Sequence, residues 1–182
     1  MSITPGPNNI MLWASGANFG LRRTLPHMLG INCGFGSLLL LCGLGLGALF
    51  EAFPVVQLIL KVVGAIYLLY LAYRLTTASF KANSEDKRPL SFWEAAGFQY
   101  ANPKAWVMGL TAMSTFALIE QSFALNALVI TLIFMVINLP CISVWALFGT
   151  AMGRFLSSPR RLRIFNGLMA TLLVATVVLV VR

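Results

Sequence analysis

Apolar residues fill most of this chain in long runs, and charged residues separate the runs at intervals. Two runs each contain a single lysine: residues 55–73 around Lys61, and residues 95–119 around Lys104. A lone cation is tolerated in a membrane span when it pairs or reaches the interface. Three further runs contain no charge and match the roughly 20 residues that cross a bilayer: 28–50, 122–149 and 164–181.

The first run, residues 3–21, starts irregularly. Its composition suits a span, but Pro5, Gly6 and Pro7 disrupt the first turns. Regular helix is expected only over residues 8–19, about 18 Å at 1.5 Å per residue. The pattern therefore predicts an all-α integral membrane protein of six transmembrane helices, the first of them truncated at its N-terminal end.

Basic residues alternate between the connections. The second and fourth connections carry Glu51 and Glu120 and no Lys or Arg. By the positive-inside rule, the other three connections are cytoplasmic and both termini lie outside. The basic residues that mark these three connections are Arg22 and Arg23, then Arg74, Lys81, Lys87 and Arg88, then Arg154, Arg160, Arg161 and Arg163.

Composition supports a membrane protein and argues against a nucleic-acid-binding one. Apolar residues make up 59% of the 182, charged residues only 10%, and the mean hydropathy is +0.85. The net charge of +8 comes from basic residues scattered between apolar runs, as topology signals are. The expected environment is a lipid bilayer.

One long polar stretch, residues 76–90, divides the chain into two halves of three spans, residues 1–75 and 91–182. An odd number of spans in each half makes the second half enter the membrane from the opposite face. Two related halves must then form an inverted repeat. The polar stretch is predicted to be a cytoplasmic connection.

Proline interrupts the first helix of each half. Ser91 and Glu94 have capping-box spacing, so a helix is expected to start near Phe92. Asn102 can end that helix and cap a second one, with Pro103 at its first position. About ten residues precede this break, but only four precede Pro5. The symmetry therefore predicts a helical segment upstream of Pro5 that this sequence does not contain.

Each break exposes the start of a helix at membrane depth. A helix N-terminus carries about half a positive charge and unpaired N–H groups, which favour an anion such as an amino-acid carboxylate. We therefore expect a substrate site at the two breaks. The carboxamide of Asn138, close to Pro140 in the sequence, is expected to contribute to the same site. The predicted site residues are Thr4, Pro5, Gly6, Pro7, Asn8, Asn9, Asn102, Pro103, Lys104 and Asn138.

Two of these assignments have alternatives. The Lys104 ammonium group either pairs with the substrate carboxylate or extends to the cytoplasmic headgroups. The asparagines either bind substrate or cap freed backbone and join helices.

The motifs at the breaks resemble the LysE/RhtB family of amino-acid exporters. Thr4-Pro5-Gly6-Pro7-Asn8 is similar to the family signature, and other stretches agree along the whole chain. Within the family, the chain looks closest to the cysteine and O-acetylserine efflux branch. The stretches that support the family are Gly64-Ala65-Ile66-Tyr67-Leu68, Ser91-Phe92-Trp93, Asn102-Pro103-Lys104 and Trp145-Ala146-Leu147-Phe148-Gly149. Those that support the branch are Leu41-Cys42, Lys87-Arg88-Pro89-Leu90-Ser91-Phe92-Trp93 and Leu110-Thr111-Ala112-Met113-Ser114-Thr115-Phe116.

The resemblance implies a secondary transporter that exports small neutral or polar amino acids by alternating access. Cysteine and O-acetylserine are the expected substrates, with homoserine, threonine and leucine left open. The family also suggests protons as the coupling ion. Asn8 stands where the signature can have Asp, and no Asp or Glu lies at membrane depth, so uniport stays open too.

Enzymatic function is not expected. The single histidine and five acidic residues lie near span ends or in connections, so no nucleophile–base pair, metal cluster or carboxylate pair can be assembled. No cofactor or metal is expected. A non-transporting scaffold or channel subunit is the main alternative, and a membrane-embedded enzyme the more remote one. A homo-oligomer is compatible with the sequence.

Overall fold

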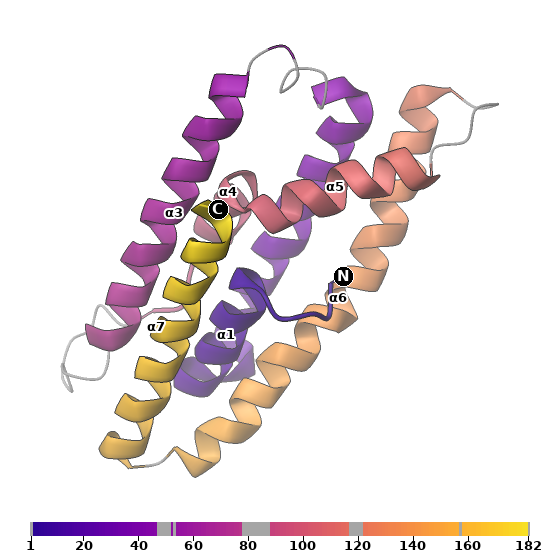
Figure 1. Cartoon of the computed structure of the whole chain (residues 1–182). Helices are drawn as coiled ribbons and strands as arrows, with labels where there is room; N and C mark the ends of the chain where they lie inside the picture. Colours follow the sequence, from indigo (N-terminus) through magenta and orange to yellow (C-terminus); the bar gives the residue numbers. More distant parts are fainter. Residues whose placement is uncertain are drawn as a thin grey trace.

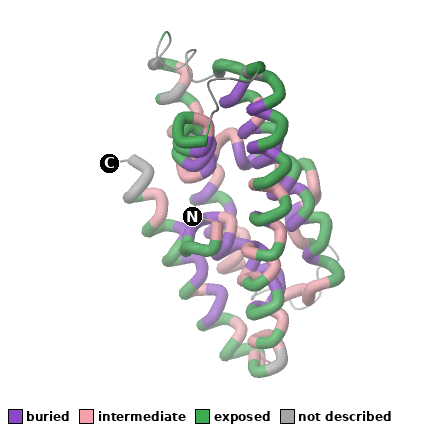
Figure 2. The backbone as a smooth tube through the Cα atoms, turned by 90° about the vertical axis from the view of Figure 1, so that its right-hand side faces the viewer, coloured by how far each residue is buried: buried purple, intermediate pink, exposed green. Residues whose placement is uncertain are grey.

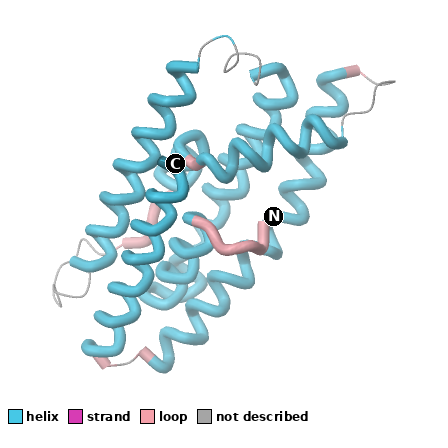
Figure 3. Tube along the Cα trace, viewed as in Figure 1, coloured by secondary structure: helices cyan, strands magenta, loops and turns pink. Residues whose placement is uncertain are grey.

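The computed structural model describes residues 2–46, 52, 54–77, 88–116, 122–156 and 158–181. These residues are helical almost throughout and contain no strand, which confirms the predicted all-α class (Figure 3). The elements are α1 (Pro7–Leu41), the π-helical segment η1 (Cys42–Leu46), α3 (Pro54–Thr77), α4 (Phe92–Ala101), α5 (Pro103–Phe116), α6 (Phe123–Phe155) and α7 (Pro159–Val181).

Helix α1 consists of two segments that meet at Gly20. Gly20 has φ 76° and ψ 167°, a left-handed backbone that glycine adopts without a steric cost. The hydroxyl oxygens of Ser15 and Thr24 lie 2.9 Å apart across it, whereas nine residues of straight helix would separate them by about 13.5 Å. The chain therefore turns back at Gly20, and the first two predicted spans are the two arms of α1.

Four described helical stretches are long and apolar enough to cross a membrane: Pro7–Gly45, Leu58–Thr77, Ala124–Gly153 and Pro159–Val178. The first of them contains both arms of α1. The predicted fourth span is not among them, because Asn102 divides it into α4 and α5, of 10 and 14 residues. The protein is a multi-pass membrane protein in which two of the six predicted spans are short or interrupted.

Each broken helix packs closely on a helix of the other half. A methyl group at Gly16, in the first arm of α1, would lie 2.2 Å from the carbonyl oxygen of Ala146 in α6. A methyl group at Gly30, in the second arm, would lie 2.3 Å from the carbonyl oxygen of Phe92 in α4. These approaches require glycine, and they bring the backbones into contact as in other membrane helix pairs.

Helix α6 touches both arms of α1. The first arm packs against the later part of α6, at Ala146. The second arm packs against the earlier part of α6, where Asn138 donates a hydrogen bond to Asn32. Pro140 lies inside α6 between these two contacts. Helices α3 and α7 pack side by side next to this central group (Figure 1).

The outward helix faces are apolar. Buried residues follow the inward faces, while exposed residues cover the outside (Figure 2). Exposed faces of this kind suit contact with lipid chains. The exposed apolar residues of α3 include Val55, Leu58, Ile59, Val62, Val63 and Ile66, and those of α6 include Leu128, Leu132, Ile133, Val136 and Ile137.

The predicted capping box at the start of α4 is present. The Ser91 hydroxyl oxygen accepts a hydrogen bond from the Glu94 backbone N–H at 3.3 Å, and the Glu94 carboxylate accepts one from the Ser91 N–H at 2.7 Å. Arg88 donates to the other Glu94 carboxylate oxygen at 3.0 Å. Helix α4 therefore begins at Phe92, as its sequence predicts.

We expect Glu94→Gln to lower stability by up to about 1 kcal/mol at pH 7, because glutamine keeps the cap but loses the ion pair. The hydrogen bond from Arg88 is the main reason that the pKa of Glu94 falls from 4.5 to about 2, although partial burial acts in the opposite direction. A lowered folded-state pKa contributes stability above about pH 4.5, and this contribution is lost as the pH falls towards 2. Thermal unfolding of wild type and Glu94→Gln in detergent at several pH values measures this contribution. An identical acid dependence in wild type and variant would contradict the assignment.

Several predictions on the connections fall outside the described residues. Glu51, Glu120, Lys81 and Lys87 are among the residues not described, as is most of the polar stretch 76–90. The division into two halves and the membrane orientation stay predictions.

Candidate functional site

The second break is formed by Asn102, which separates α4 from α5. Its backbone is extended, at φ −96° and ψ 104°, and its side chain is buried. The Asn102 side-chain oxygen accepts a hydrogen bond from the Lys104 N–H at 3.2 Å. Asn102 therefore ends one helix and caps the next, with Pro103 at the first position of α5, as the sequence predicts.

The first break consists of the non-helical residues before Pro7. Gly6 is extended, and Pro7 occupies the first turn of α1. The Asn9 side chain turns back and donates hydrogen bonds to the carbonyl oxygens of Ser2 at 2.9 Å and Thr4 at 2.7 Å. Asn9 thus satisfies backbone groups that a continuous helix would have paired.

Lys104 links the two breaks. Its ammonium group donates hydrogen bonds to the Thr4 carbonyl oxygen at 2.8 Å, the Thr4 hydroxyl oxygen at 2.8 Å and the Pro5 carbonyl oxygen at 3.1 Å. The freed carbonyls of the first break therefore hold the half-buried ammonium group of Lys104 at the junction of the two breaks.

Two carboxamide pairs surround this contact. Asn8 and Gln99 exchange two hydrogen bonds, at 2.8 Å and 3.1 Å, and Asn138 donates to Asn32 at 3.0 Å. Each pair joins the first half of the chain to the second. Reciprocal amide pairs satisfy polar groups that would be costly to bury alone.

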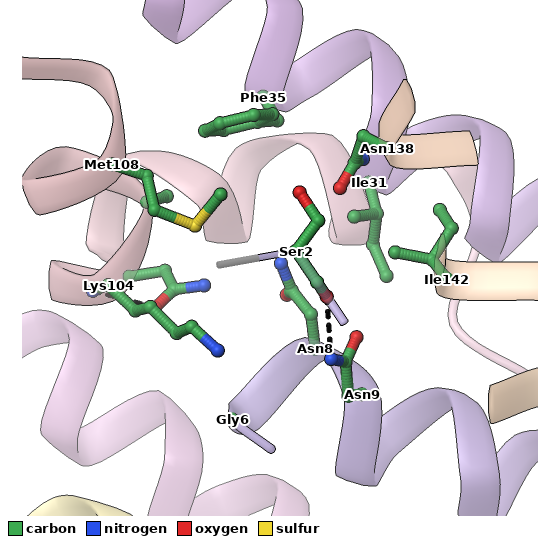
Figure 4. Close-up of a pocket in the computed structure, with 12 residues that line it drawn as sticks. Ser2, Gly6, Asn8, Asn9, Ile31, Phe35, Lys104, Met108, Asn138 and Ile142 are labelled. Atoms are coloured by element: carbon green, nitrogen blue, oxygen red, sulfur yellow. Dashed lines mark hydrogen bonds between the residues drawn. The ribbon is translucent and has the colours of Figure 1, made fainter. Parts of the chain in front are cut away.

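A cavity lies where these groups meet (Figure 4). Six of the ten predicted site residues line it: Gly6, Asn8, Asn9, Asn102, Lys104 and Asn138. The other four do not: Thr4 and Pro5 bind Lys104 beside the cavity, and Pro7 and Pro103 begin the adjoining helices. The lining residues that the sequence did not indicate are Ser2, Ile31, Phe35, Ala105, Met108 and Ile142.

Polar and apolar side chains both line the cavity. Figure 4 shows Asn8 and Asn9 across from Phe35, while Lys104 and Met108 lie next to each other on one side and Asn138 lies beside Ile31. Lys104 is the single charged residue among the described lining residues, and no carboxylate is among them. Across the described residues, no group of three His, Cys, Asp or Glu side chains could hold a metal ion. The arrangement suits a small zwitterion that carries no cationic side chain.

Comparison with known proteins agrees with the resemblance noted in the sequence. The model of the LysE type translocator family matches residues 1–182. A cysteine/O-acetylserine efflux protein of Klebsiella pneumoniae is 33% identical over 181 residues, covering 99% of this chain and 91% of that protein. The protein of that name in Salmonella typhimurium is 35% identical over 125 residues, covering 69% of this chain and 64% of that protein. No solved structure was found to match.

Proposed function

Because this chain belongs to the LysE type translocator family, we propose that it exports small neutral or polar amino acids, cysteine and O-acetylserine foremost, from the bacterial cytoplasm. The cavity between the two breaks is the observation that supports this function. It combines one ammonium group with several carboxamides and the N-terminal turns of two helices, all within the membrane-spanning part of the chain. Homoserine, threonine and leucine are the alternative substrates.

In the proposed binding mode, Lys104 and the N-terminal turn of α5 receive the substrate carboxylate. The Lys104 cation and the positive end of the α5 helix dipole both stabilise an anion there, while Asn102 already accepts the first backbone N–H groups of α5. The side-chain oxygens of Asn8, Asn9 and Asn138 accept hydrogen bonds from the substrate ammonium group. Binding then exchanges the carbonyl partners of Lys104 for a carboxylate, which forms the stronger, charge-assisted hydrogen bond.

Alternating access between two inverted halves is the proposed transport mechanism. Its support is the reciprocal packing of the broken helices, in which α4 lies on the second arm of α1 and the first arm lies on α6. Broken helices in corresponding positions of two halves are typical of transporter sites. The first half is residues 1–75 and the second is residues 91–182.

The proposed orientation puts both termini outside and the turn of α1 at the cytoplasmic face of the inner membrane. Asn18 and Asn166 exchange hydrogen bonds of 2.8 Å and 3.1 Å, which bring the turn of α1 next to the start of α7 (Figure 1). The arginines at these two places therefore lie at one end of the molecule, as the positive-inside rule requires. They are Arg22, Arg23, Arg160, Arg161 and Arg163.

Counterflow in proteoliposomes tests the proposed function. Vesicles loaded with unlabelled O-acetylserine are expected to accumulate labelled cysteine or O-acetylserine at a saturable rate, whereas empty-lipid vesicles do not. Absence of counterflow for cysteine, O-acetylserine, homoserine, threonine and leucine would refute export by this protein. A pH gradient imposed in a second series distinguishes proton antiport, which the gradient accelerates, from uniport, which follows the amino-acid gradient alone.

A further inference from the structure

Four of the residues that line the cavity are apolar and tightly packed. Ile31 and Phe35 come from the second arm of α1, Met108 from α5 and Ile142 from α6, and each is at most 7% exposed. We call these four residues the apolar wall. The polar interactions of the proposed site do not use them.

We propose that the apolar wall, and Met108 above all, selects amino acids with a narrow, unbranched and uncharged side chain. This inference rests on the proposed function, since it concerns the substrate of the same site. A zwitterion whose carboxylate and ammonium groups bind Lys104 and the asparagines of the cavity directs its side chain towards the apolar wall. The lining residues offer no carboxylate to a cationic side chain there.

The register of α5 connects the carboxylate position to the wall. Lys104 and Met108 are four residues apart, so they lie on the same face of the helix with their Cβ atoms roughly 5–6 Å apart. A substrate held by Lys104 therefore places its side chain against Met108.

The four wall residues differ in how far they can yield. Ile31 and Ile142 are β-branched and stiff at χ1, and the Phe35 ring is rigid. Met108 has three rotatable side-chain bonds and a polarizable sulfur, so it adapts to the length of an unbranched chain. A branched side chain needs width near its branch point, and Met108 together with the rigid residues fills that width. The wall thus favours cysteine and O-acetylserine over leucine and threonine.

Replacement of Met108 by alanine tests this inference. In counterflow assays, Met108→Ala is expected to raise the rate for leucine relative to cysteine on the order of tenfold, the scale on which a hydrophobic pocket discriminates small groups. Met113→Ala is the matched control. Met113 lies on the same helix, but it packs beside Gly43 and does not line the cavity. Its leucine-to-cysteine ratio is expected to equal that of wild type.

The outcomes separate the inference from the proposed function. An unchanged ratio in a folded Met108→Ala variant that still transports cysteine would refute the selection by Met108 and leave export intact. Failure of the wild type to transport any amino acid would refute export itself. If Met108→Ala does not fold, Met108→Leu nearly conserves the volume. Its stiffer branched side chain is expected to lower the leucine-to-cysteine ratio, and an unchanged ratio would again refute the inference.

Discussion

Replacement of Lys104 by methionine is expected to lower amino-acid export at least tenfold while the protein stays in the membrane. Methionine keeps the length of the side chain but removes the ammonium group, which in the proposed binding mode exchanges Thr4 and Pro5 for the substrate carboxylate. Hydrogen bonds to a charged group are worth about 1.5–3 kcal/mol each, and about 1.4 kcal/mol corresponds to a tenfold change in affinity. Initial rates and KM in proteoliposomes measure the effect.

Two variants control this experiment. Lys104→Arg keeps the charge and is expected to retain part of the activity with a higher KM, because its larger planar guanidinium group does not present the charge to the substrate carboxylate at the position of the compact ammonium group. Lys61→Met removes a cation from α3 that does not line the cavity, and it is expected to transport normally. Wild-type rates and KM in Lys104→Met would exclude Lys104 from substrate binding.

The substitution Gly64→Ala is expected to reduce both folded protein and export strongly. Gly64 lies in α3 where it meets α4, and a methyl group there would lie 1.9 Å from the Ala101 carbonyl oxygen. That carbonyl directly precedes Asn102, so relief of the clash must displace the second break and Lys104 with it. Overpacking of this kind costs roughly 1–3 kcal/mol. We expect a lower thermal midpoint in detergent and a lower export rate for each folded molecule.

Gly167→Ala is the matched control for this change. Gly167 also lies inside a spanning helix, α7, but a methyl group there would meet no atom within 4 Å. Alanine has the better helix propensity, so this variant is expected to be as stable as wild type or slightly more stable. Equal thermal midpoints and rates in Gly64→Ala and Gly167→Ala would show that the contact between α3 and α4 does not require glycine at position 64.

Local sequence chemistry predicted the second break to the residue. The capping box starts α4 at Phe92, and the proline at position 103 forces Asn102 out of the helix. Both effects depend only on residues within four positions along the chain, so both could be predicted from the sequence. The hypothesis of an inverted repeat also predicted that the two breaks meet, because such a repeat would bring the first helices of its halves together.

Other features needed the folded structure. The connection expected after residue 21 is absent, because Gly20 alone reverses the chain and the second arm of α1 continues through Pro26. Helix α6 runs to Phe155 and α7 starts at Pro159, beyond the charge-free windows, because helices continue past the apolar core to their own caps.

The partners in the site were equally hidden in the sequence. Gln99 and Asn32 gave no signal, since their amide partners are about a hundred residues away. The apolar wall gave none because Ile31, Phe35 and Ile142 are ordinary residues of apolar spans. An apolar run predicts that a helix is buried in the membrane, but it does not distinguish the face towards lipid from the face towards a cavity.

The position of Pro140 in α6 has a mechanical consequence. Before Pro140, α6 holds the second arm of α1, which carries Ile31 and Phe35; after it, α6 holds the first arm, which carries Asn8 and Asn9. Proline removes one backbone hydrogen bond and makes a helix easier to bend at that point. A bend at Pro140 would therefore change the angle between the two arms about their vertex at Gly20. Bending of α6 alone would then move both arms of α1, and it would widen or narrow the cavity without separating the two halves of the chain.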